Sequence, residues 1–340
     1  MTEIENPDKD IVTVQNGVKK LSYRKGLVIL TIFLFLGLII GISQCSSAFS
    51  EMNTRSAVIK NKSIFSLLRG DYIGVLKIEG TIEPENSEYN QRWLLETIER
   101  LTNDPQNRVL VIEINTPGGS VYESDEAYLA LRSYAQQKPL YAYCTSLAAS
   151  GGYYIACAAD TIFANRNTLT GSIGVISGQS IDITGLLEKA GVKITTITAG
   201  SNKNMLNFNE RLSEEQKAIM QSIADECYTQ FTTIVAERRN IDLATVQSIA
   251  DGRIYTAQQA LDLKLIDGIN DFGNTISVII ADNDLSGSIS LEYFEYEKQQ
   301  TFLENFLGIS SLIDTARSET SAVFKYLDSQ VAFPAYYFKF

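Results

Sequence analysis

Between residues 71 and 165, short apolar segments alternate with longer helix-like ones, and this alternation constrains the fold more than any other feature of the chain. The run RVLVIEIN at 108–115 shows little alternation of apolar and polar residues, which is typical of a parallel strand covered on both faces. Strand-like segments lie at 72–80, 108–115, 139–144 and 160–165, and helix-like segments lie between them, for example at 87–103 and 124–137. The sequence therefore predicts an α/β fold with mostly parallel strands and crossover helices.

The clearest single helix is predicted from Ser213 to Arg239. It opens with the sequence Ser213-Glu-Glu-Gln216, in which the serine and glutamine side chains can cap one another's backbone N–H groups. Apolar side chains then recur at helical spacing, which predicts an amphipathic helix. They are Ile219, Ile223, Cys227, Phe231, Ile234 and Val235.

Residues 26–43 form an uncharged apolar run, GLVILTIFLFLGLIIGIS. As a helix it would extend roughly 27 Å, close to the hydrocarbon thickness of a bilayer. Lysine and arginine precede the run, and such charges stay on the cytoplasmic side. The sequence therefore predicts a cytoplasmic tail at 1–25, a single transmembrane helix at 26–43 in contact with membrane lipid, and a linker at 44–70. The remainder is expected on the extracytoplasmic side of the cell membrane.

A cleaved signal peptide is the alternative interpretation of the same run. Ser46-Ser47-Ala48 supplies small residues where cleavage could occur. The run is, however, longer than the apolar core of about 7–15 residues that is usual in signal peptides. The retained anchor is therefore the favoured interpretation.

The chain has no histidine, and this absence removes several classes of active site. A Ser-His-Asp triad, a Cys-His protease and a His-ligated zinc site are all excluded. The four cysteines include no C-x-x-C pair, so no metal site and no cofactor is predicted. The formal charge of −11 argues against nucleic acid as a partner, because phosphate binding requires a basic surface.

Three glycine-marked turns carry the candidate chemistry. Gly118 and Gly119 follow a predicted strand, where two glycines let backbone N–H groups face outward as an oxyanion hole requires. Ser150, in the motif AASGGYY, lies between a strand and a helix-like run, where the helix dipole would stabilise an oxyanion. Ser172 lies in the turn TGSIGV. Taken singly, these motifs are also explained by tight turns and, for Ser150, by a helix cap.

Together, the ordered motifs resemble the signal peptide peptidase SppA family of Ser/Lys proteases. The shared pattern is a strand ending in T-P-G-G, then A-A-S-G-G-Y-Y and T-G-S-I-G-V, then a lysine, and finally a G-R-x-x-T segment followed by L-I-D. The resemblance covers residues 71–275. It implies a Clp/crotonase-like fold and hydrolysis of peptide bonds by a Ser/Lys dyad.

The resemblance assigns roles to five residues: Ser150 is the nucleophile, Lys203 the general base, Gly118 and Gly119 the oxyanion hole, and Ser172 the hydrogen-bond partner of the lysine amine. A lysine has an ordinary pKa near 10.4, so it acts as a base only if desolvation lowers that value by several units. Lys193 is the rival base, but it lies in the strand-like run VKITTIT and is expected to face solvent.

The chain departs from the family pattern at a few positions. Ala257 and Lys264 stand where glycine is expected, which puts the local turns in doubt but not the dyad. Asn204 follows the lysine, where an acidic residue is common.

The C-terminal extension at 284–340 lies outside the resemblance. Its aromatic end, 331–340, would be an aggregation hazard if it were exposed, so something must cover it. It either packs on its own domain or a neighbour, or lies as an added strand in a substrate groove, kept extended around Pro334. The second arrangement would make the tail autoinhibitory.

These features predict a membrane-anchored serine endopeptidase whose protease domain spans 71–283. Its expected substrates are cleaved signal peptides or other membrane-associated peptides. A regulatory protease for a specific membrane protein is the alternative, and a catalytically inactive oligomeric membrane scaffold is an alternative of a different class. A crotonase acting on acyl-CoA is disfavoured by the anchor. The resemblance further implies a homo-oligomer whose neighbouring copies share substrate-binding grooves.

Overall fold

The computed structural model of the chain describes residues 70–285, 289–298 and 335–337. The predicted cytoplasmic tail, the transmembrane helix and the linker, except for its last residue Gly70, lie outside these ranges, as does most of the C-terminal extension. Among the residues described, no helix combines the length and the apolar character needed to cross a bilayer.

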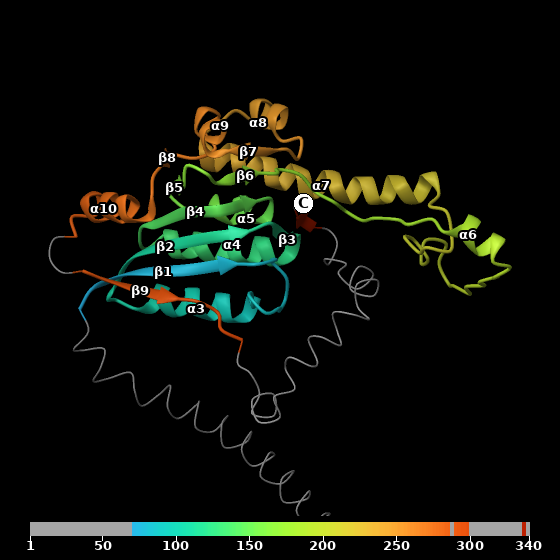
Figure 1. Cartoon of the computed structure of the whole chain (residues 1–340), viewed down its shortest axis with the longest axis horizontal. Helices are drawn as coiled ribbons and strands as arrows, with labels where there is room; N and C mark the ends of the chain where they lie inside the picture. Colours follow the sequence, from blue (N-terminus) through green and yellow to red (C-terminus); the bar gives the residue numbers. More distant parts are fainter. Residues whose placement is uncertain (1–69, 286–288, 299–334, 338–340) are drawn as a thin grey trace, which may run out of the picture. The chain divides into compact units, whose positions relative to one another are not determined.

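A sheet of eight strands forms the centre of the fold (Figure 1). Its main path is β7-β6-β4-β2-β1-β9, and β5 pairs with both β4 and β8. Every pairing in this sheet is parallel except that of β6 with β7. The strands are β1 (Tyr72–Glu79), β2 (Asn107–Thr116), β4 (Leu140–Ala149), β5 (Thr161–Ala164), β6 (Leu169–Gly171), β7 (Ile254–Thr256), β8 (Gly268–Ile269) and β9 (Ser290–Phe294). The predicted α/β fold with mostly parallel strands is thus confirmed.

Helices cover both faces of the sheet, which explains the uninterrupted apolar strands. On β2, Leu110 and Ile112 enter a large core together with residues of α3, α4, α5 and α7, whereas Val109 and Val111 enter a smaller core against α10. The helices are α3 (Gln91–Asn103), α4 (Val121–Ala135), α5 (Gly151–Ala156), α6 (Thr184–Lys189), α7 (Glu214–Arg239), α8 (Leu243–Ile249), α9 (Ala257–Asp262) and α10 (Phe272–Asp282).

The predicted long helix is confirmed as α7, including its capping box. The Gln216 backbone N–H donates to Ser213 Oγ at 3.2 Å, and the Ser213 N–H donates to Gln216 Oε1 at 3.1 Å. By contrast, the strand-like run at 192–198 forms no strand among the described residues, because no neighbouring strand pairs with it.

Part of the C-terminal extension belongs to the main sheet. β9 pairs in parallel with β1 at the edge of the sheet, with Tyr72 opposite Ser290. The sheet therefore does not end at the predicted domain boundary, residue 283. A second, two-stranded sheet joins β3 (Gly118–Ser120) to β10 (Ala335–Tyr337) from near the chain's end.

Candidate active site

Ser150 occupies a strained turn between β4 and α5. Its φ is 54° and its ψ −114°, a region that residues other than glycine rarely adopt. The residue is almost fully buried, its backbone N–H donates to the Gly171 carbonyl at 2.8 Å, and its hydroxyl does not cap α5. Ser150 thus stands at the N-cap position of α5, but its side chain does not cap the helix. Strain held in place by surrounding structure is characteristic of functional sites.

The turn at Gly118 and Gly119 packs directly against the Ser150 turn. A Cβ atom on Gly151 would lie 2.5 Å from Ser124 Oγ and 3.2 Å from Gly119 N, and one on Gly118 would lie 2.6 Å from Gly151 N. Glycine is therefore required where the two backbones approach each other. The Gly118 N–H donates to Thr116 Oγ1 at 3.1 Å, so it already has a partner within the fold.

Ser172 lies beside Ser150 at the end of the neighbouring strand. In the pairing of β4 with β6, Ala149 stands opposite Gly171, so the two serines follow paired residues. Ser172 is buried, has a φ of 51°, and its N–H donates to the Arg253 carbonyl at 2.8 Å. The G-R-x-x-T motif thus holds the Ser172 turn in place.

Lys203 has quite different surroundings. It lies in the segment 176–212, which we call the arm; this segment carries α6 away from the sheet (Figure 1). Its side chain is exposed, and no hydrogen bond or ion pair to its amine is found among the residues described. The rival base Lys193 lies on the same arm and is exposed as predicted. A single chain therefore brings together Ser150, Ser172 and the two glycines, but not Lys203.

Apolar side chains on the arm are unusually exposed. Ile197 is 95% exposed and Leu186 65%. Ile176, Val192 and Phe208 are also exposed. Exposed apolar surface is typical of sites that contact another molecule when the side chains form one patch.

The tail strand β10 lies antiparallel along β3, next to the Ser150 turn. Tyr336 stands opposite Gly119 and is fully buried. Its ring stacks on Tyr154 at 4.9 Å and packs against Phe231 at 4.8 Å, and its hydroxyl donates to the Cys227 carbonyl at 3.0 Å. These three residues thus pack on their own domain, the first of the two predicted arrangements, and they do so as an added strand.

The aromatic pocket around Tyr336 was missed by sequence reasoning. The Tyr154 hydroxyl donates to Asp125 at 2.6 Å and accepts from Gln230 Nε2 at 2.7 Å. Burial and, after it, the Asp125 hydrogen bond raise the pKa of Tyr154 well above its ordinary value. The available signal was the second tyrosine of the AASGGYY motif, which follows the Ser150 turn.

The L-I-D motif has a structural role. Asp267 accepts from the Ile162 N–H at 2.7 Å and forms two hydrogen bonds with Arg239, at 2.6 and 3.0 Å. It thereby ties α7 to the sheet. Among the described residues there is no cluster of three or more acidic, cysteine or histidine side chains able to hold a metal ion.

Comparison with known proteins gives consistent matches over this region. Residues 132–286 match Peptidase family S49. A protein of Enterococcus faecium that bears the name signal peptide peptidase SppA is 35% identical over 207 residues, which are 61% of this chain and 60% of that protein. The chloroplastic serine protease SPPA of Arabidopsis thaliana is 29% identical over 241 residues, 70% of this chain and 36% of that protein. The chain thus spans less than two thirds of the length of these relatives.

Among solved structures, a ClpP1 mutant from Listeria monocytogenes overlaps 59% of this chain and 92% of its own. Its TM-score is 0.41 and its sequence identity 15%. A likeness at this level adds nothing to what the sheet itself shows of the fold.

Proposed function

Because this chain belongs to the signal peptide peptidase SppA family, we propose that it is a serine endopeptidase with Ser150 as its nucleophile. The observation that carries the proposal is the conformation of Ser150, which is buried and held at positive φ against the Gly118–Gly119 turn. A serine fixed in this way beside backbone N–H groups can attack a carbonyl and leave its oxygen facing hydrogen-bond donors.

In the proposed reaction, Ser150 Oγ attacks the peptide carbonyl and its proton passes to the Lys203 amine. Backbone N–H groups of the Gly118–Gly119 turn stabilise the resulting oxyanion, with Gly119 the better placed because Gly118 already donates to Thr116. The protonated lysine then gives its proton to the leaving amine, and water releases the acyl group from Ser150. Ser172 positions the lysine amine by a hydrogen bond.

We further propose that Lys203 reaches Ser150 from a neighbouring copy of the chain. Lys203 is exposed on the arm, whereas Ser150, Ser172 and the two glycines are buried together in one chain. The exposed Ile197 and Leu186 on the same arm supply the apolar surface that a contact between copies requires. In such a homo-oligomer, assembly desolvates the lysine and completes the dyad at once.

Peptide substrates are proposed to lie along β3 as β10 does, antiparallel and with one side chain in the pocket of Tyr154 and Phe231. That pocket favours aromatic or apolar residues. This agrees with the proposed substrates, cleaved signal peptides or other membrane-associated peptides. On this proposal, residues 26–43 anchor the enzyme in membrane lipid, with the catalytic domain on the extracytoplasmic side.

The decisive experiment mixes two inactive variants of the full-length protein. Ser150→Ala and Lys203→Ala should each abolish peptide hydrolysis. Because the two residues act as one catalytic unit, the double variant should be as inactive as either single variant. Co-assembled from a mixture, the two variants should recover activity, because the Lys203→Ala copy supplies Ser150 and the Ser150→Ala copy supplies Lys203. Lys193→Ala, a change of the same kind on the same arm, serves as the matched control and should stay active.

Each failure has a separate meaning. Activity retained by Ser150→Ala would refute Ser150 as the nucleophile, whereas a wild-type protein that hydrolyses no peptide would leave the inactive scaffold as the better description. Single variants that are inactive, together with a mixture that stays inactive despite demonstrated co-assembly, would refute only the sharing of the dyad between copies.

A further inference from the structure

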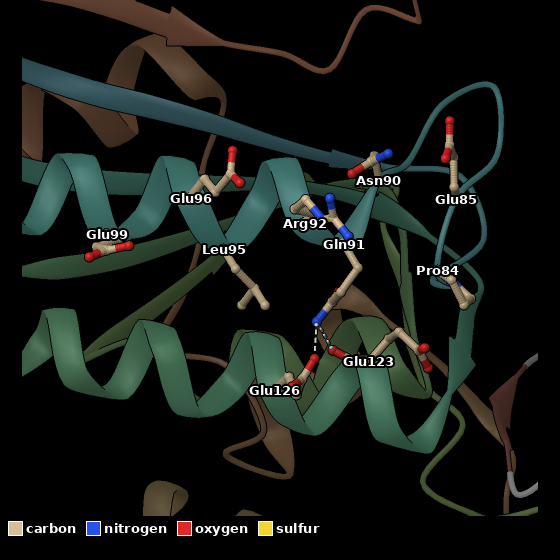
Figure 2. Close-up of a pocket in the computed structure, with 10 residues that line it drawn as sticks. All are labelled: Pro84, Glu85, Asn90, Gln91, Arg92, Leu95, Glu96, Glu99, Glu123 and Glu126. Atoms are coloured by element: carbon tan, nitrogen blue, oxygen red, sulfur yellow. Dashed lines mark hydrogen bonds between the residues drawn. The ribbon is translucent and has the colours of Figure 1, made fainter. Parts of the chain in front are cut away.

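A pocket lies between α3 and α4, bounded at one end by the loop that carries Pro84 and Glu85 (Figure 2). Its volume is about 640 Å³, within the range of small-ligand sites. The charged side chains that line it are five glutamates and one arginine: Glu85, Glu96, Glu99, Glu123, Glu126 and Arg92. None of the residues assigned to the proposed reaction lines it.

One of these glutamates is buried without a hydrogen-bond donor. Glu123 is only 8% exposed, and its Oε2 accepts no hydrogen bond from the described part of the chain. Two of the nearby donors, the Gln91 amide and the Tyr89 hydroxyl, are already engaged. Gln91 Nε2 donates to the Glu123 backbone carbonyl and to Glu126 Oε2, each at 3.2 Å (Figure 2). The Tyr89 hydroxyl donates to Gln91 Oε1. A buried carboxylate oxygen is costly unless a donor reaches it, so the donor is expected from outside.

The negative charge around Glu123 favours a cation as the ligand of this pocket. Within the described ranges, none of the five glutamates takes part in an ion pair. Burial and, after it, the negative charges of Glu123 and Glu126 raise the pKa of Tyr89. The described residues offer no metal-binding cluster, while Leu95 and Pro84 add apolar wall to the pocket. An alkyl chain that ends in an ammonium or guanidinium group fits both the apolar and the acidic parts.

We propose that this pocket binds the lysine or arginine side chain of a peptide substrate, with Glu123 and Glu126 as its carboxylate partners. The two glutamates stand one turn apart on α4, a spacing at which neighbouring side chains can share one partner. The pocket is thus a second substrate contact, separate from the reacting residues. This inference rests on the proposed function.

The register of β10 supports a peptide as the source of the cation. Ala335 stands opposite Ser120, so the residues before it in a bound strand lead past the end of β3 toward the first turn of α4, where Glu123 lies. β10 also contacts α4. At about 3.3 Å per residue, a basic side chain roughly two to four residues further toward the peptide's N-terminus comes within reach. Substrates with a basic segment before an apolar one would meet both sites.

The test uses fluorescently labelled peptides and full-length protein carrying Ser150→Ala, so that binding is read without cleavage. Each peptide contains Ala-Tyr-Tyr preceded, two to four residues away, by arginine or by citrulline, its uncharged counterpart. The arginine peptide should bind roughly tenfold more tightly, as expected of a hydrogen bond to a charged group. Adding Glu123→Gln should reduce its affinity to that of the citrulline peptide, whereas Glu226→Gln, the same charge change at an exposed site on α7, should not.

Thermal melting shows whether each variant is folded. A second variant, Glu126→Gln, should weaken the binding of the arginine peptide but not that of the citrulline peptide. Equal affinity for the two peptides, or an unchanged preference in Glu123→Gln, would overturn the proposal. So would spermidine binding that depends on Glu123 while the two peptides bind alike, because the pocket would then take a free cation. If the wild-type protein hydrolyses no peptide yet the arginine preference holds, the protease assignment fails and the pocket stands.

Discussion

The Ser150 turn and the arm at 176–212 are built in opposite ways. Around Ser150, packing is so close that a Cβ at residue 151 would lie 2.5 Å from Ser124 Oγ, and both serines are buried with their N–H groups bonded to neighbouring carbonyls. On the arm, Lys203 is exposed and Ile197 is almost fully so. A single chain therefore brings the proposed nucleophile together with its surroundings but leaves the proposed base, Lys203, outside. The contrast indicates that assembly, not folding alone, would switch on the chemistry.

The largest expected effect comes from adding one methyl group to a glycine in each region and comparing the two variants. In Gly151→Ala the new Cβ meets Ser124 Oγ and the Gly119 backbone, so activity should fall by about 100-fold or more through misplacement of the Ser150 turn. The free energy of unfolding should fall by about 1–3 kcal/mol. Peptide hydrolysis and urea denaturation measure the two.

The matched variant is Gly185→Ala on the arm. Its Cβ meets nothing within 4 Å, and alanine favours the helix by up to about 1 kcal/mol, so neither stability nor activity should fall. Similar losses in both variants would mean that the two regions are packed alike.

A smaller effect is expected from the apolar surface of the arm. Ile197→Ser should leave the folded chain as stable as before, because the side chain is 95% exposed. It should weaken assembly and lower activity roughly tenfold if Ile197 is an anchor of the contact between copies. Light scattering and hydrolysis, measured over a range of protein concentrations, check this. Tyr293→Ser, at an exposed site on β9, is the control, and equal behaviour of the two variants would contradict the contact.

The tail should have a modest effect of opposite sign. Tyr336→Ala removes the stacking on Tyr154 and the contact with Phe231, so β10 should leave β3 more often. Hydrolysis of added peptides should then rise a few-fold, because a larger fraction of sites is open. Truncation after residue 325 should act in the same direction. Unchanged activity, or loss of the folded protein in both variants, would make the tail purely structural.

The smallest expected effect concerns the backbone conformation of Lys264, which lies outside the arm. Lys264 has a φ of 61°, which favours glycine, and it stands where the family pattern has glycine. Lys264→Gly should therefore raise the free energy of unfolding by up to about 1 kcal/mol. Lys217→Gly, within α7, should lower it by a similar amount. A loss of stability in Lys264→Gly would show that the lysine side chain contributes more to the free energy of unfolding than its positive φ costs.

The fold was predictable from the sequence where a segment with a clear local pattern packs against, or is capped by, residues of the same chain. The run at 108–115 became a buried strand because helices cover both its faces, and the Ser213–Gln216 box formed because both partners lie within one turn. The run at 192–198 has the composition of a strand, yet nothing pairs with it among the described residues. Local pattern alone could not predict that.

The candidate site follows the same rule. The position of Ser150 at a strand-to-helix turn was readable from the sequence, as was the glycine content of its neighbours. The exposure of Lys203 was not, because a motif specifies a residue but not the surface that will cover it. The Tyr336 pocket also escaped prediction, since its walls come from Tyr154 and Phe231, which are distant in sequence.

The tail strand has a consequence for when the enzyme would work. On the proposed function, β10 occupies the place of a substrate, and it is tied to the same chain as β3. A tethered competitor keeps a constant local concentration, of millimolar order for short flexible links, however dilute the protein is. Scarce peptides would then seldom displace it, whereas abundant ones would. The protease would ignore a background of passing peptides and respond to their accumulation.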